Sequence, residues 1–244
     1  MVTTEVFLRF WAKAIPSLQI HPGDAMALKG NRHTLALDTL VGPFMGPVRT
    51  APVILLTLNG GFSGVERDEA KTPAVRELMA RNLRGDAPLP TFATNPAGRK
   101  WTESRLAQFG LSYAVASLKV AFVNLIPYRS REGAKDLHMI KRLESARLVR
   151  AWAHDTLFRE AEAGKRVVVC LRSAGAWGLE SDTQRGLSLF TPRFTRAGFM
   201  LHGPMREKVS FAVQRTVGLV AATPAPRPQS ILSRNRLLTP TEPT

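Results

Sequence analysis

The sequence predicts an α/β fold: a single-domain three-layer sandwich whose central, mainly parallel four-stranded sheet is flanked by helices. Three apolar runs carry this prediction, at residues 53–58, 118–126 and 167–171. None of them shows the alternation of a half-exposed strand, which indicates parallel strands buried on both faces. Segments with helical spacing separate the runs, as in sheets covered by helices. A chain of 244 residues can bury one such core.

The amino-terminal residues 1–51 are expected to belong to the same domain. Apolar side chains between Val6 and Ile15 recur on one side of a helix, which should end before Pro16. The residues that follow are rich in glycine and proline. We expect them to form a loop that leads into the first central strand.

The first central strand ends at Asn59-Gly60-Gly61. Adjacent glycines let the chain turn and let a ligand approach the backbone, and open α/β sheets bind ligands at the carboxyl ends of their strands. The alternative is a hairpin, because Asn-Gly is a strong hairpin signal. A helix predicted at residues 73–83, opened by Thr72-Pro73, favours a strand, a turn and then a helix.

The rest of the chain continues this alternation within a core predicted at residues 52–220. A proline-rich tail with scattered arginines, residues 221–244, is expected to be flexible. A short helix is predicted at 101–109, before the second strand. After the second strand we expect a helix at 137–163, ended by Gly164, and then the third strand. Short strands at 187–190 and 198–201 and a helix at 206–217 complete the predicted core.

The chain carries 34 Lys and Arg against 19 Asp and Glu, a net charge of +15. Such an excess favours a polyanionic partner, and DNA is the one that we expect. The alternative is a generally basic protein. No basic amphipathic helix and no membrane-spanning run stands out, so we expect no membrane partner. We expect a monomer.

A single cysteine, Cys170, lies in the third apolar run. It excludes a disulfide framework and a zinc site built from thiolates, so no metal is expected. Neither nucleotide-binding glycine motif occurs, so we expect no cofactor. The amino terminus lacks the features of a secretory signal, which predicts a cytoplasmic protein.

Three polar side chains follow predicted strands: Asn59, Asn124 and His202. In a parallel sheet all three would lie at one edge of the molecule. An amide offers donors and acceptors that pair with the edge of a nucleobase. The sequence therefore suggests a pocket for a neutral heterocycle carried on a polyanionic backbone.

These segments resemble the uracil-DNA glycosylase superfamily. PVILLTLNGGFS looks like its first motif, and LKVAFVNLIPY looks like the strand whose terminal Asn reads a pyrimidine edge. VVVCLRSAGAW resembles the intervening strand, and GFMLHGPM stands where the family has a strand leading to its histidine motif. The segments occur in the family's order over residues 53–217. Gly60 replaces a usual proline, and the histidine turn lacks the family's serine.

The resemblance implies a role for each residue. Asn59 would hold the attacking water, and His202 would donate to the carbonyl oxygen of the departing base. Asn124 would hydrogen-bond the base edge, while Phe62 or Phe122 would offer an aromatic face. The alternatives are structural: Asn124 caps a loop, His202 is a surface residue and Phe62 belongs to the core.

Gly61 stands where one branch of the superfamily has a tyrosine that excludes groups on C5 of the base. The glycine implies that a 5-substituted pyrimidine is accepted. One branch of the superfamily excises glucosylated hydroxymethylcytosine from phage DNA, and the open turn is compatible with that substrate.

Extruding a base from duplex DNA also needs contacts to phosphates. The candidates are basic residues beside the predicted strand ends: Arg129, Arg131, Arg172, Arg206 and Lys208. Solvated surface charge is the alternative for each of them.

Two other functions compete with the glycosylase. A metal-dependent nuclease would use acidic residues, namely Glu66, Asp68, Glu69 and Glu103, although their spacing is not that of a regular metal site. A non-catalytic DNA-binding module would use only the net positive charge of the chain to bind DNA.

Overall fold

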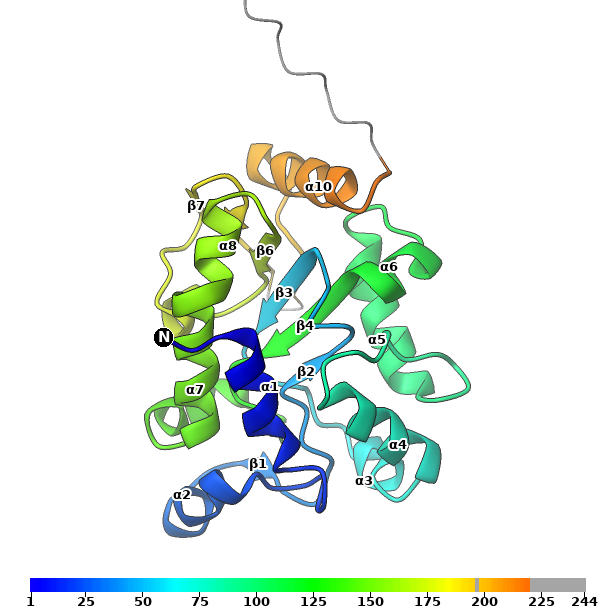
Figure 1. The fold of residues 1–244 in the computed structure, drawn as a ribbon, viewed down its shortest axis with the longest axis vertical. Helices are drawn as coiled ribbons and strands as arrows, with labels where there is room; N and C mark the ends of the chain where they lie inside the picture. The colour runs from blue at the N-terminus through cyan, green and yellow to red at the C-terminus, as the bar shows by residue number, and fades with distance from the viewer. Residues whose placement is uncertain (196–197, 220–244) are drawn as a thin grey trace, which may run out of the picture.

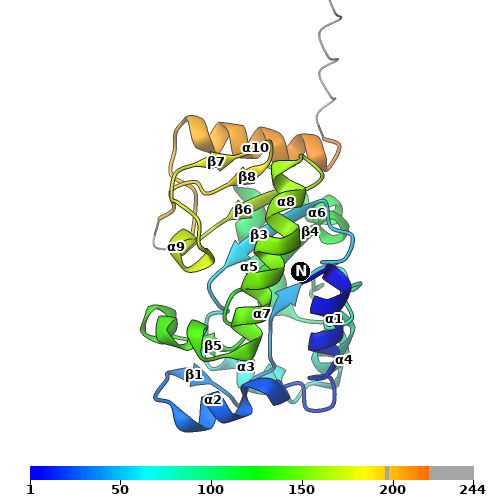
Figure 2. The same ribbon diagram turned by 60° about the vertical axis from the view of Figure 1, so that its left-hand side comes forward.

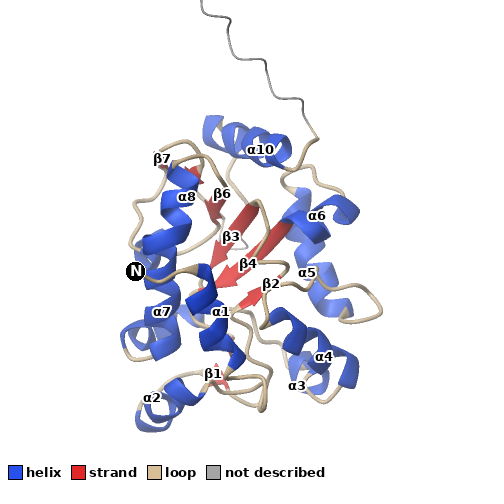
Figure 3. Cartoon of the chain, in the orientation of Figure 1, coloured by secondary structure: helices blue, strands red, loops and turns tan. Residues whose placement is uncertain are grey.

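The computed structural model describes residues 1–195 and 198–219 and shows a mixed α/β fold (Figure 1, Figure 3). Its main sheet has the strand order β2-β4-β3-β6-β8-β7. The strands are β2 (Phe44–Met45), β3 (Val53–Thr57), β4 (Val120–Asn124), β6 (Val167–Cys170), β7 (Gln184–Arg185) and β8 (Leu189–Phe190). A separate pair joins β1 (Leu35–Ala36) to β5 (Arg129–Ser130). The tail predicted at 221–244 lies outside the described residues.

The prediction of a four-stranded, mainly parallel sheet is wrong, because the sheet has six strands and is mixed. The strands β4, β3, β6 and β8 pair in parallel. Short antiparallel strands are added at both edges, β2 against β4 and β7 against β8. Each edge strand has only two residues, which is too short for a recognisable pattern. In addition, β2 pairs with β4 far along the chain, whereas β7 pairs with β8 in a local hairpin.

The register aligns the carboxyl ends of the central strands. Thr57 pairs with Asn124, and Leu56 pairs with Cys170. The residues that follow these positions, among them Asn59 and Arg172, therefore leave the sheet at one edge. This outcome matches the expectation for Asn59 and Asn124, whereas the strand expected before His202 is not part of the sheet.

Each face of the sheet has its own hydrophobic core, so the fold has three layers. Along β3, Ile54 and Leu56 join one core, while Val53 and Leu55 join the other. All five residues of β3 are buried, as the apolar run predicts. In Figure 2, α7 and α8 stand in front of the sheet, on the side of the core that contains Ile54.

The helices cover both faces and the ends of the sheet. Their bounds are α1 (Thr4–Ala12), α2 (Ala25–Gly30), α3 (Val65–Glu69), α4 (Pro73–Asn82), α5 (Pro96–Ala107), α6 (Tyr113–Lys119), α7 (Glu144–Trp152), α8 (Phe158–Glu162), α9 (Ala174–Trp177) and α10 (Pro204–Thr216). Among them are 3₁₀ turns at Pro22–Asp24 and Gly133–Lys141 and a π-helical turn at Ala153–Leu157. No helix in the described part of the chain is both long and apolar enough to span a bilayer.

Three predicted elements differ from the structure. The helix expected at 137–163 begins with a 3₁₀ segment, becomes α-helical at Glu144 and contains the π turn. Only residues 120–124 of the strand expected at 118–126 form β4, because residues 118 and 119 are the last residues of α6. Residues 198–201 do not join the sheet, since the pairing of Met200 is an isolated antiparallel bridge with Phe194.

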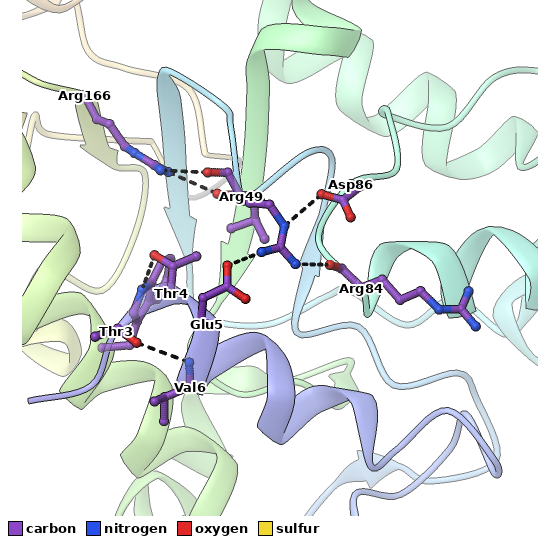
Figure 4. Close-up of polar contacts among 10 residues, drawn as sticks. Thr3, Thr4, Glu5, Val6, Arg49, Arg84, Asp86 and Arg166 are labelled. Atoms are coloured by element: carbon purple, nitrogen blue, oxygen red, sulfur yellow. Dashed lines mark hydrogen bonds and ion pairs between the residues drawn. The ribbon is translucent and has the colours of Figure 1, made fainter.

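A network around Arg49 fixes the loops at the amino ends of the strands (Figure 4). Its guanidinium contacts Glu5 of α1, Asp86 at 3.0 Å and the carbonyl of Arg84 at 3.2 Å. Arg166, just before β6, donates to the carbonyls of Val48 and Arg49 at 3.0 and 2.8 Å. These contacts tie α1 and the segments before β3 and β6 together, at the end of the sheet opposite the predicted site.

Truncating a buried side chain of β3 tests how tightly the core packs against this strand. Ile54 is fully buried, so Ile54→Ala should lower the free energy of unfolding by about 2–5 kcal/mol, because it leaves a cavity. The matched control Ile54→Val should cost only about 0.5–1.5 kcal/mol. Urea denaturation of the full chain measures both. A loss below 1 kcal/mol for Ile54→Ala would contradict the packing described for β3.

Candidate functional site

A cavity of about 370 Å³ opens at the carboxyl edge of the sheet. It lies between the strands β2 and β4 and the helices α3, α4 and α5, which are neighbours in Figure 1. The volume falls in the range of small-molecule sites, roughly 300–1,000 Å³. The walls combine apolar side chains with a few polar groups, including Asn82, Asn95 and Asn124.

The cavity brings together the four residues predicted to bind a base. Gly61, Phe62, Phe122 and Asn124 all line it. They come from the glycine turn after β3 and from β4. Arg129, predicted to contact phosphate, also lines this cavity.

The side chain of Asn124 is held in a fixed orientation. Its Nδ2 donates to the carbonyl of Gly42 at 2.6 Å, and its Oδ1 accepts from the hydroxyl of Thr57, the last residue of β3. An amide has two N–H donors and two acceptor lone pairs. One of each is engaged, so Asn124 retains one donor and one acceptor for a ligand.

Two aromatic rings form a wall beside Asn124. Phe122 is 2% exposed, and its ring centroid lies 5.0 Å from that of Trp101, at an interplanar angle of 60°. Trp101 lies on α5 and lines the cavity, a role that was not expected from the sequence. An aromatic residue on a predicted helix carries no local signal of which way it faces.

The glycine turn is held by the neighbouring strand β5. The backbone N–H of Ser130 donates to the carbonyl of Gly60 at 3.1 Å, and the guanidinium of Arg129 donates to the carbonyl of Gly61 at 3.1 Å. A Cβ added at Gly61 would meet no atom within 4 Å. The turn is therefore fixed by its backbone while its Gly61 side stays open.

Phe62 is half-buried and carries two guanidinium groups against its ring. Those of Arg67 and Arg131 lie 4.8 and 5.4 Å from the ring centroid. Cations over an aromatic face are attracted by the ring quadrupole. Arg131, a predicted phosphate residue, is thus placed beside the cavity through Phe62.

Two carboxylates also line the cavity, Glu66 and Glu69 of α3. Burial opposes the charge of Glu66, but N–H donors from Ser63 at 2.9 Å and Gly64 at 3.0 Å and the nearby Arg129 outweigh it. The pKa of Glu66 is therefore lowered.

Burial raises the pKa of Glu69, and the charge of Glu66 adds to this effect, while Arg129 and the amide of Asn95 oppose it. From the sequence, both glutamates were expected to act only in the nuclease alternative. The sequence shows the acidic cluster, but it does not show that α3 directs these two side chains toward the cavity.

Asn59 lies at the same edge but is not among the residues that line the cavity. Its amide faces Gly133, where a Cβ would lie 2.4 Å from Oδ1 of Asn59. The Nδ2 atom of Asn59 is buried and has no hydrogen-bond partner in the described part of the chain.

His202 lines a second cavity of about 380 Å³, together with Arg206 and Lys208. This cavity lies beside Pro192 and Arg193, just past β8. The strands β4 and β8 are three positions apart in the sheet, about 14 Å at the usual strand spacing. The expectation that Asn59, Asn124 and His202 share one pocket is therefore corrected, because the two cavities are separate along one edge.

Arg172 follows β6, between the two cavities. A Cβ added at Gly198 would lie 3.8 Å from Cδ of Arg172 and 3.6 Å from Nε of Arg105. Burial lowers the pKa of Arg105, and the charge of Arg172 lowers it further. Neither guanidinium is in a salt bridge within residues 1–195 and 198–219.

The carboxylates of the nuclease alternative do not form one group. Asp68 is exposed and pairs with Lys71 at 3.1 Å, and Glu103 pairs with Arg99 on α5. Over the residues that the structure describes, no three His, Cys, Asp or Glu side chains are placed to hold a metal ion.

Comparisons with protein-family models, with curated proteins and with solved structures found no match to this chain.

Removing the charge of Arg129 tests the electrostatics of the cavity. Arg129→Met should raise the pKa of both Glu66 and Glu69, because a nearby positive charge favours the ionised carboxylate. NMR titration of the side-chain carboxyl carbons measures both values. Arg81→Met, on α4 and outside the cavity, is the control and should change neither. Unchanged pKa values in Arg129→Met would show that its charge does not reach the two glutamates.

Proposed function

We propose that this protein is a DNA glycosylase, which takes a pyrimidine base out of DNA, hydrolyses its N-glycosidic bond and leaves an abasic site. The observation that carries the proposal is the oriented amide of Asn124 inside a cavity walled by Phe122, Trp101 and an open glycine turn. A flipped base needs hydrogen bonds to its edge and contacts to its faces. The cavity supplies groups of both kinds.

The reaction passes through a transition state with oxocarbenium character, in which the base departs with negative charge. A donor fixed toward the base stabilises that charge, and its effect is large in a site that excludes water. The free N–H of Asn124 is such a donor, because Thr57 and Gly42 hold its amide in place. The buried Nδ2 atom of Asn59 donates to no residue in the described part of the chain. We propose that Asn59 holds the attacking water.

The open side of Gly61 and the cavity volume favour a 5-substituted pyrimidine over strict selection of uracil. Glucosylated hydroxymethylcytosine is one base of this kind. Carboxylates and amides on the wall formed by α3 and α5 are groups that hydrogen-bond polar substituents.

The DNA backbone is proposed to run along the carboxyl edge of the sheet. Arg105 and Arg172 both approach Gly198, and the charge of Arg172 acts on Arg105, so a phosphate bound beside them would relieve this repulsion. Beyond them, the second cavity presents Arg206 and Lys208. The guanidinium of Arg206 lies 3.2 Å from the ring of His202, so we assign this histidine to the backbone contacts. The separation of about 14 Å between β4 and β8 corresponds to roughly four base steps of 3.4 Å.

Two apolar side chains are exposed on the segment that leads to His202. Phe199 is 38% exposed and lies under the guanidinium of Arg105, at 4.6 Å. Leu201 is 43% exposed and lines the second cavity. Proteins that bend DNA insert apolar side chains between base steps. Arg105 also lies over Trp101, which lines the base cavity, so we propose that Phe199 occupies the space of the extruded base.

Base release tests the proposed reaction. The chain should produce alkali-labile sites in duplexes with uracil, thymine mismatches, hydroxymethylcytosine or its glucosylated form, and chelator should not prevent this. Asn124→Ala should lower the rate about 10²–10³-fold, as for loss of one fixed donor to a developing anion. Asn59→Ala should also abolish release while leaving DNA binding intact.

Asn31→Ala is the control, because Asn31 only caps α2 by donating to the carbonyl of Ala27. Direct strand cleavage that stops in chelator would favour the nuclease, and binding without release from any of the four duplexes would favour the binding module.

Salt dependence tests the backbone contacts. DNA affinity should fall steeply with salt, with a slope of about −0.9 per neutralised phosphate. The double variant Arg206→Gln, Lys208→Gln should reduce that slope by about 2. The matched double variant Arg9→Gln, Lys13→Gln, on and beside α1 and outside both cavities, should leave it unchanged. Fluorescence anisotropy with a labelled duplex measures the slopes, and equal slopes in both double variants would refute this DNA path.

A further inference from the structure

The two carboxylates of the cavity differ in what they can offer a ligand. The oxygens of Glu66 accept hydrogen bonds from the backbone N–H groups of Ser63 and Gly64 and from the hydroxyl of Ser63. Glu69 receives no backbone N–H within the described ranges, and its charge is supported by nearby Arg129 and by the amide of Asn95. Glu69 therefore keeps acceptor capacity in the cavity.

Asn124 alone does not distinguish cytosine-type from uracil-type bases. It retains one donor and one acceptor, and both kinds of base present donors and acceptors on this edge. An ionised carboxylate is different because it only accepts. Carboxylates recognise cytosine through its exocyclic N4 amine, whereas uracil and thymine carry the acceptor O4 at that position.

We infer that Glu69 makes the cavity selective for amino-bearing pyrimidines, the cytosine class, over 4-carbonyl pyrimidines. This inference rests on the proposed function and names its substrate class. A cytosine-type base gives the half-buried carboxylate a donor. A uracil-type base turns an acceptor toward it and leaves the charge without a partner, which is costly away from water. One such contact corresponds to a preference of about tenfold to a hundredfold.

The selectivity should depend on pH. A protonated Glu69 carries an O–H donor and can pair with O4, so the preference should shrink as pH falls through the pKa of this group. Burial raises that pKa, with Glu66 adding to the effect and Arg129 and Asn95 opposing it. The preference should therefore weaken at a higher pH than an ordinary glutamate would allow.

The experiment compares two duplexes that differ only at position 4 of the target base, one with 5-hydroxymethylcytosine and one with 5-hydroxymethyluracil. The chain should release the cytosine base at least about tenfold faster. Glu69→Gln presents both a donor and an acceptor, so it should bring the ratio near one by accepting the uracil base. Glu69→Asp keeps the acceptor and should retain the direction of the preference.

Glu77→Gln is the matched control, because Glu77 lies on α4 of the same wall but is exposed and outside the cavity. It should leave the ratio unchanged. Equal release of both bases by the unmodified chain, or an unchanged ratio in Glu69→Gln, would overturn the inference while leaving the proposed reaction in place.

Binding of the free bases separates the two proposals. In a thermal-shift titration, 5-hydroxymethylcytosine should raise the melting temperature and 5-hydroxymethyluracil should not, and Glu69→Gln should lose this difference. Selective stabilisation without base release from any tested duplex would retain the selectivity and refute the glycosylase. If neither base stabilises the chain and neither is released, the inference about Glu69 fails, and the proposed reaction is then decided by the uracil and thymine-mismatch duplexes.

Discussion

The in-register pairing of β3 between β4 and β6 is the constraint on which the rest of the structure depends. Every residue of β3 is buried, so the strand cannot shift without moving its alternating side chains out of the two cores. Its last residue, Thr57, pairs with Asn124 and also holds the amide of Asn124 through its hydroxyl. The same register thus sets both the core and the orientation of the candidate base-reading group.

The sequence predicted the parts of this arrangement that have a local pattern. The apolar runs of β3, β4 and β6 and the positions of Gly61 and Asn124 at the carboxyl edge of the sheet follow from strand order and polarity. The strand β2 could not be predicted, because Phe44 and Met45 become a strand only by pairing with residues of β4 far along the chain. The cavity roles of Trp101 and Glu69 depend on how α5 and α3 pack, which periodicity does not reveal.

Positive and negative side chains lie in different places at the carboxyl edge of the sheet. Cations gather along the carboxyl edge, while the cavity at that edge holds two carboxylates beside one guanidinium. A polyanion would be attracted to the edge, and its phosphates would be repelled from the cavity interior. In the proposed function, this division favours the entry of a neutral base while the backbone remains outside.

The burial of Cys170 has a practical consequence. It is the single cysteine of the chain, its side chain lies in β6 at 2% exposure, and burial raises its pKa to about 12. The thiolate is the reactive form, so this residue should resist alkylating reagents in the folded protein. A new cysteine at the exposed Ser63, on the rim of the cavity, would then carry a fluorophore at one defined place. The natural chain is thus already suited to site-specific spectroscopy of ligand entry.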